Sequence, residues 1–241
     1  MKTMKALLVM VVLSLVFCGC TKSSKTIIRL QKLETGVSSP TTEAELKDAI
    51  QKYQDRIADI QLSDTQIGIW YKMLAVRYLD AKMYGEALKN FQIAIQYYPA
   101  NQNLYYYVGI CAGYMSHAAL DYSATGNNPE RNNYLKLAES AYLRAIELEP
   151  RYARALYAIG VLYVMEMNDC EKAVPYLETL LTIEKRNFDG MFVLARAYYV
   201  IGEYEKAAAL YDNIAANTKD QSRKAEAQAN KKIVMDAAYA Q

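Results

Sequence analysis

Few side chains in this sequence combine the types and the spacing that catalysis or metal binding requires. The chain has one histidine, His117, and four cysteines, Cys18, Cys20, Cys111 and Cys170. Cys111 and His117 are six residues apart, so on one helix their side chains would point about 240° apart and could not share a metal ion. His117 has no obvious companion for nucleophilic or general-base work. We therefore expect no enzymatic activity, no metal site and no cofactor.

Two of the cysteines, Cys111 and Cys170, fall in segments whose residue pattern predicts helices. Outside the reducing cytoplasm they would form a disulfide if their Cα atoms lay within about 7 Å of each other. Otherwise they are buried free thiols, which behave as small apolar side chains. The sequence leaves both alternatives open.

Cys20 follows a segment that has the form of an export signal. Lys2 and Lys5 precede an apolar run from Ala6 to Phe17, and a short positive segment followed by such a run is typical of a secretory signal. The run is too short to be a comfortable membrane span. Without Lys2 and Lys5 the chain has equal numbers of basic and acidic residues, which gives no electrostatic basis for binding nucleic acid.

The residues Phe17, Cys18, Gly19 and Cys20 resemble the lipobox of bacterial lipoproteins, with Phe17 where leucine is usual. The resemblance implies that residues 1–19 are removed as a signal peptide and that Cys20 carries the lipid, usually with an acylated amine, which anchors the chain to a membrane. A cleaved signal without lipid is the alternative. Thr21 stands where the Asp that retains lipoproteins in the inner membrane would be, which favours the outer membrane and places the chain in the cell envelope, on its periplasmic or surface face.

Beyond residue 20 the composition changes from a tether to a folded domain. Residues 20–40 are rich in Ser, Thr and Lys and are interpreted as a lipid-anchored tether. Over the whole chain 53% of the residues are hydrophobic and 22% are charged, with only five prolines and ten glycines. This composition favours a helical globular domain, which we place at residues 41–241.

A spacing of small and aromatic residues recurs four times along this domain. The first copy has Tyr71, Leu74, Ala75 and Tyr78, then Tyr84, Ala87, Phe91, Ala94 and Pro99. The second has Tyr105, Val108, Gly109 and Ala112, then Ala138, Tyr142, Ala145 and Pro150; the third has Leu156, Ile159, Gly160 and Tyr163, then Ala173, Leu177 and Leu180; the fourth has Leu194, Ala195, Tyr198, Gly202, Tyr204, Ala207, Tyr211 and Ile214.

These copies resemble the tetratricopeptide repeat, a pattern of about 34 residues in which small residues let two antiparallel helices approach closely. The resemblance implies an all-α fold: a right-handed superhelical array of helical hairpins, with repeats at residues 68–101, 102–152, 153–187 and 188–221. Helical spacing of apolar residues predicts a separate N-terminal capping helix at 42–62, and a mostly polar pattern predicts a C-terminal capping helix at 222–239.

Two of the copies depart from the regular spacing. The second has an insertion at about residues 116–132, for which the sequence predicts a helix continuing from Tyr105 to Ser123 and a new helix starting at Asn128 and Pro129. We expect the insertion to contact the partner or a sister subunit, with a tolerated loop extension as the alternative. The third copy has one added residue between its helices.

In tetratricopeptide proteins the first helix of each repeat usually lines the groove in which ligands bind. Carried onto the matching positions of this sequence, the resemblance implies a groove that is mostly apolar and aromatic. Its residues are Lys72 and Val76 in the first copy, Tyr106 and Ile110 in the second, Tyr157, Val161 and Val164 in the third, and Phe192, Arg196 and Tyr199 in the fourth. Val76 stands where a carboxylate-binding Asn would be, so we do not expect recognition of a peptide's terminal carboxylate.

An apolar groove suits an amphipathic helix, an extended apolar segment or a lipophilic ligand, unless the chain's own insertion or terminal helix fills it. We therefore expect a membrane-anchored scaffold that binds a protein or peptide partner. The alternative is an accessory component of a periplasmic substrate-binding transporter system, with a small apolar ligand in the groove. Homo-oligomerisation through the capping helices is also open.

Overall fold

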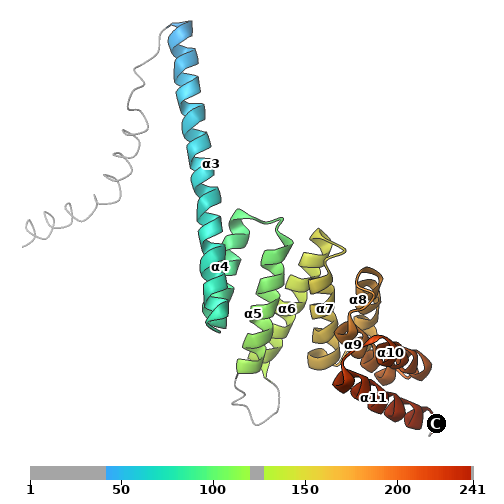
Figure 1. The fold of residues 1–241 in the computed structure, drawn as a ribbon. Helices are drawn as coiled ribbons and strands as arrows, with labels where there is room; N and C mark the ends of the chain where they lie inside the picture. The colour runs from blue at the N-terminus through green and yellow to red at the C-terminus, as the bar shows by residue number, and fades with distance from the viewer. Residues whose placement is uncertain (1–41, 120–127, 240–241) are drawn as a thin grey trace, which may run out of the picture. The chain divides into compact units, whose positions relative to one another are not determined.

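The computed structural model describes residues 42–119 and 128–239, and all regular secondary structure in these ranges is helical (Figure 1). The predicted signal peptide, Cys20, the whole of the predicted tether and the middle of the predicted insertion lie outside these residues. The described elements are α3 (Glu43–Asp80), α4 (Tyr84–Tyr97), α5 (Gln102–Ala118), α6 (Pro129–Leu148), α7 (Ala153–Val161), a π-helical segment η1 (Leu162–Met167), α8 (Cys170–Ile183), α9 (Phe188–Val200), α10 (Tyr204–Asn217) and α11 (Gln221–Tyr239).

The contacts between residues divide the chain into two units, Met1–Leu62 and Ser63–Gln241. The described part of the first unit is the N-terminal portion of α3, and the second unit contains the end of α3 and all later helices. In the second unit consecutive helices pack against each other along the chain, from α4 on α5 to α10 on α11. The all-α repeat array predicted from the sequence is therefore confirmed.

The prediction of a separate capping helix at 42–62 was wrong, because α3 continues without a break from Glu43 to Asp80. The residues between the predicted cap and the first repeat, 63–67, include neither proline nor glycine that would end a helix. Thr42 and Glu45 start the helix with a reciprocal capping box. The Thr42 N–H donates to Glu45 Oε2 at 3.0 Å, and the Glu45 N–H donates to Thr42 Oγ1 at 3.3 Å.

Each hairpin is held at a small residue on its first helix, as predicted. Ala75 and Ala195 are fully buried, and Gly109 and Gly160 are also buried. A Cβ atom at Gly109 would overlap the ring of Tyr142 on α6, and one at Gly160 would overlap the side chain of Leu177 on α8. The two helices are therefore as close as the backbone of the first helix allows.

These contacts produce two buried apolar clusters within the second unit. The first cluster joins α3, α4, α5 and part of α6 around Phe91 and Leu104. The second joins residues from α5 to α11 around Leu156, Leu177 and Ile214. The last helix, α11, places Ala227 and Val234 in the second cluster, which agrees with its predicted role as a C-terminal cap.

The first helix of a repeat ends in a similar turn in three of the four copies. A left-handed residue follows the helix, Lys82 with φ 59°, Asn168 with φ 53° and Gly202 with φ 82°. In the first and fourth copies the next N–H donates to a carbonyl five residues earlier, as in a Schellman motif.

In the third copy the corresponding hydrogen bond spans six residues instead of five: the Asp169 N–H donates to the Tyr163 carbonyl at 2.9 Å. The added residue therefore lies inside the wide turn of η1, rather than between the helices.

The second copy agrees only in part with its prediction. Asn128 caps α6, because its side-chain oxygen accepts from the Arg131 N–H at 2.9 Å, and Pro129 is in the first turn. However, α5 ends at Ala118 instead of continuing to Ser123, and Ala119 has extended backbone angles. The reason is visible in one bond: Asn128 Nδ2 donates to the Ala119 carbonyl at 3.0 Å, which joins the two ends of the insertion.

Cys111 and Cys170 are both free and buried, so of the two alternatives the structure has two free thiols. Burial raises the pKa of the Cys111 thiol to about 12. Burial also raises the pKa of Cys170, against the opposing effect of the positive charge of Arg196. Neither thiol is therefore suited to act as a nucleophile.

Among the helices within residues 42–119 and 128–239, none is both long enough and apolar enough to span a bilayer.

Replacing Gly109 with alanine should destabilise the array by about 1–3 kcal/mol, because the new methyl group meets the buried Tyr142 ring. Gly113 on the same helix is the matched control, since a Cβ there has no neighbour within 4 Å. Gly113→Ala should stabilise by up to about 1 kcal/mol through helix propensity. Urea unfolding of both variants measures the difference, and equal effects would show that the close approach is not the constraint.

The Cys111 thiol should react slowly with iodoacetamide in the folded protein. A pKa raised by burial from 9.0 to about 12 lowers the thiolate fraction by about 1000-fold at pH 8. Labelling followed by peptide mass spectrometry, with the urea-unfolded chain as reference, tests this. Labelling of the folded chain at the unfolded rate would show that Cys111 is accessible.

Candidate binding face on the first helices of the repeats

Three consecutive hollows lie along the first helices of the second, third and fourth repeats. We call them the N-terminal, middle and C-terminal hollows, and together the hollow face; their volumes are about 360, 210 and 410 Å³. The first two share Ile110 and Tyr114. The middle and C-terminal hollows meet at η1, where Glu166 lines one and the adjacent Met165 lines the other.

Four of the nine residues that line the N-terminal hollow are tyrosines. Tyr84 and Tyr114 stack with ring centroids 4.2 Å apart. The guanidinium of Arg154, at the start of α7, lies 4.4 Å from the ring centroid of Tyr106 and 5.5 Å from that of Tyr107. These rings therefore hold a cation against an aromatic surface, an arrangement that favours contact with apolar or acidic groups of a ligand.

Tyr106 and Ile110 line this hollow as predicted, whereas Tyr84, Tyr114 and Arg154 were missed. Arg154 occupies the first turn of its helix, three residues before the predicted Tyr157. That spacing places Arg154 on the same helix face as Tyr157. Extending the predicted row of groove residues by one turn toward the N-terminus would have identified Arg154.

The middle hollow contains a group of charged side chains on its rim. Glu166 accepts from Arg131 Nη2 at 2.9 Å, and its other oxygen lies 3.4 Å from His117 Nε2. His117, which the sequence left without a companion, therefore has one. The group joins the end of α5, the start of α6 and η1, so it links the two ends of the insertion to the third repeat.

Between these charges and the array core, the middle hollow is apolar, with Val161, Leu162 and Ala158 among its lining residues. No group of three His, Cys, Asp or Glu side chains is arranged to hold a metal ion within residues 42–119 and 128–239. The middle hollow is therefore apolar inside, with charged side chains on its rim.

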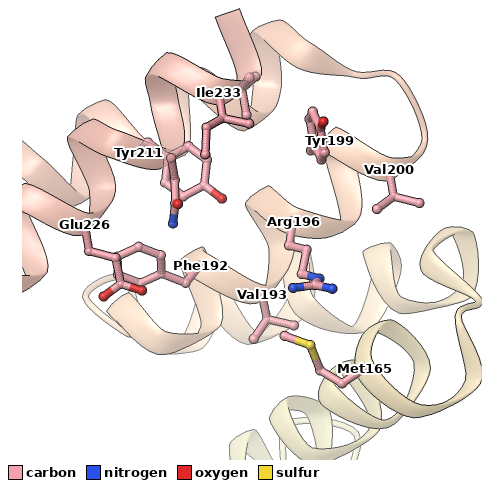
Figure 2. A pocket seen from close by; sticks show the side chains of 11 residues that line it. Met165, Phe192, Val193, Arg196, Tyr199, Val200, Tyr211, Glu226 and Ile233 are labelled. Carbon is pink, nitrogen blue, oxygen red and sulfur yellow. The ribbon is translucent and has the colours of Figure 1, made fainter. Parts of the chain in front are cut away.

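The C-terminal hollow lies between α9 and α11 (Figure 2). Its lining from α9 includes the predicted residues Phe192, Arg196 and Tyr199. Met165 lines it from η1. Glu226, Asn230 and Ile233 line it from α11. The terminal helix therefore forms one wall, and it leaves the hollow open instead of filling it.

Several predicted groove residues are placed differently by the structure. Val164 is only 4% exposed and belongs to the core, so its assignment to the groove was wrong. The reason is the wide turn of η1, which shifts the later residues by one position, so that Met165 lines the hollow in its place.

Lys72 and Tyr157 line none of the three hollows. Lys72 is exposed on α3, and Val76 packs against the first cluster. Tyr157 is half-buried against the second cluster; burial, and secondarily the charge of Asp189, raises its pKa. Phe192 lines its hollow but also packs on Tyr211, with ring centroids 5.9 Å apart. It therefore contributes to the fold as well as to the surface.

Comparison with known proteins agrees with this fold. The family model described as "Tetratricopeptide repeat" matches residues 164–230. A TPR repeat-containing protein of Borreliella burgdorferi is 23% identical over 212 residues, which cover 85% of this chain and 88% of the relative.

Among solved structures, a thermophilic TPR protein of Thermus thermophilus has a TM-score of 0.54 at 20% identity, covering 77% of this chain and 90% of its own. YrrB, described as a TPR protein with an unusual peptide-binding site, has a TM-score of 0.55 at 16% identity, covering 70% of this chain and 76% of its own. At these identities the likeness shows the fold. Together the matches show that the helices form an array like those of tetratricopeptide repeat proteins, and the family model itself covers residues 164–230.

Proposed function

We propose that this protein is a membrane-anchored scaffold that binds a polypeptide partner along its hollow face. The observation that carries the proposal is a series of exposed apolar side chains lining consecutive hollows. Tyr114, Met165, Val200 and Ile233 are 49%, 45%, 52% and 56% exposed, and each lines a hollow. Contiguous apolar surface of this kind is typical of an interaction site.

The arrangement of the hollows favours an extended partner. A small ligand is usually held in one enclosed cavity, which buries most of its surface. Here three open hollows follow one another, and a helix or an extended segment could place a side chain in each. That the solved TPR structure of YrrB is described as having a peptide-binding site supports the same use of the fold.

The charged groups of the face would orient the partner. Asp80, Lys82 and Arg154 line the N-terminal hollow, Glu166 lines the middle hollow, and Arg196 and Glu226 line the C-terminal hollow. Such groups contribute register and specificity, while covered apolar surface contributes roughly 25 cal/mol per Å². We expect a mostly apolar segment that carries both acidic and basic side chains.

A second candidate rests on the C-terminal hollow alone. Its volume of about 410 Å³ falls in the range of small-molecule sites, roughly 300–1,000 Å³. A small apolar solute held between α9 and α11 would fit an accessory component of a periplasmic substrate-binding transporter system.

The membrane anchor is proposed from the sequence. Residues 1–20 have the order of a lipoprotein export signal, with Gly19 before Cys20. A lipid on Cys20 and a tether to about residue 40 would hold the array near the envelope membrane that it serves, and Thr21 favours the outer membrane. The scaffold would thus recruit its partner to that membrane.

A photo-crosslinking amino acid in place of Met165, or of Tyr114, should capture the same polypeptide in cells of the source organism. The matched control is Met73, which is similarly exposed at 52% and lines none of the three hollows. For the captured partner, Met165→Ser should weaken binding by about 10-fold, and Met73→Ser should leave it unchanged.

Mass spectrometry of the cross-linked products distinguishes the candidates. Capture of an apolar solute by Met165 alone would support the transporter accessory. Equal capture from Met73 would show that the hollow face is not the binding site. Thermal unfolding of each variant checks that the array remains folded.

The chain extracted from membranes should begin at Cys20 and carry a lipid on that cysteine. Cys20→Ala should release the protein from the membrane fraction, and Cys18→Ala should not, because position 18 needs only a small residue. Intact-mass spectrometry and fractionation measure both. An unmodified Cys20, or a mature N-terminus at another residue, would contradict the anchor and leave the partner-binding proposal to be judged separately.

A further inference from the structure

The N-terminal portion of α3 has a row of exposed apolar side chains along one side. Each is between 40% and 57% exposed. The row consists of Leu46, Ile50, Tyr53, Ile57 and Ile60. Both buried clusters of the described residues contain only residues from Tyr71 onward, so this row contributes to neither.

The spacing of the row identifies the surface that would cover it. Successive members are separated by four, three, four and three residues. An average repeat of 3.5 residues is that of a coiled coil, in which a second helix follows the row with a slight left-handed supercoil. In heptad notation, Ile50 and Ile57 occupy a positions, while Leu46, Tyr53 and Ile60 occupy d positions.

The residue types at these positions favour two parallel helices. β-Branched Ile at the a positions with Leu at d, as at Leu46, is the combination found in parallel dimers, whereas Ile at d, as at Ile60, is more common in trimers. The flanking residues are also compatible: in a parallel pair, Ala49 and Arg56 at g positions would face Gln54 and Gln61 of the other copy. No like charges would meet there. Arg56 already lies beside the row, 5.2 Å from the ring centroid of Tyr53.

Within residues 46–60, the charges that would oppose pairing lie away from the row. Glu43 and Lys47 form an ion pair at 2.7 Å, and Asp48 and Lys52 form another at 2.7 Å. Asp48 and Lys52 occupy outer heptad positions and Lys47 an e position, whereas Glu43 occupies the a position before Leu46, so the pairing would start after Glu43. From Leu46 to Ile60 the helix is therefore charged on its outer side and apolar along the row.

The register also explains where the pairing would end. The a position after Ile60 is Asp64, and a parallel pair would bring two carboxylates face to face there. This residue lies just after the boundary between the two units, at Leu62 and Ser63. Farther along the same heptad positions, Tyr71 and Tyr78 pack against the first cluster of the repeat array.

We propose that two copies of this chain form a parallel coiled coil through residues 46–60. The pairing depends on α3 alone and so does not rest on the proposed binding function of the hollow face. In a parallel pair the N-terminal ends of both helices lie at the same end of the coiled coil. This arrangement suits two copies tethered to one membrane.

Sedimentation equilibrium of the full chain in density-matched detergent tests the pairing. The native chain should be a dimer, and the double variant Ile50→Lys with Ile57→Lys should raise the dissociation constant by about 100-fold or more, since two apolar pairs are replaced by like charges. The matched control is Gln51→Lys with Ala58→Lys. It adds the same charge at exposed b positions of the same helix and should remain dimeric.

Thermal unfolding of the repeat array should be the same in both double variants, because the row lies outside its buried clusters. This measurement separates loss of pairing from loss of folding. A monomeric native chain, or equal dissociation of the two variants, would overturn the proposal. Binding of a monomeric Cys20→Ala chain to phospholipid vesicles, lost on Ile50→Lys, would instead assign the row to a membrane surface.

Disulfide cross-linking tests the direction of the pair. Leu46→Cys and Ile60→Cys should each cross-link to the same residue of the second copy, because equal positions face each other in a parallel register. Ala58→Cys, on the outer side, should not. Cross-links that form only when the Leu46→Cys and Ile60→Cys chains are mixed would show an antiparallel pair and overturn the parallel one.

Discussion

The contact between a glycine on the first helix and a large side chain on the second, present in the second and third repeats, is the constraint on which this fold depends. At Gly109 the large side chain is Tyr142, and at Gly160 it is Leu177. Because this contact fixes how each first helix is rotated about its axis, it also determines which side remains uncovered. The hollow face is that uncovered side, repeated from α5 to α9, so the packing of the hairpins and the placement of the proposed binding residues have one cause.

Much of the fold was predictable because each repeat uses local spacing that a sequence displays directly. The small positions, the cap at Asn128 and the C-terminal helix all followed from residue types at fixed intervals. Two boundaries did not follow. The start of the first repeat is hidden because no proline or glycine precedes Gly68 at the predicted boundary in α3, and the end of α5 is accompanied by a bond between Asn128 and Ala119, nine residues apart in sequence. Such a bond leaves no local signal.

The candidate site was predictable only where the repeats are regular. Tyr106, Ile110, Arg196 and Tyr199 occupy the expected face because ordinary α-helical geometry holds in α5 and α9. The grouping of side chains from different helices depends on tertiary packing, which repeat spacing does not encode. Arg154 on the Tyr106 ring is an example. So is Glu166, whose two neighbours come from α5 and α6.

The single extra residue in η1 shows how a repeat protein can diversify without redesigning its interior. Insertion within a helix normally rotates everything beyond it by about 100°, but here the wide turn and the left-handed Asn168 restore the frame before α8 begins. Only a few side chains around Met165 and Glu166 change between the buried core and the exposed face. Gain or loss of one codon at this point would thus exchange the residues offered to a ligand while the hydrophobic framework on either side is inherited unchanged.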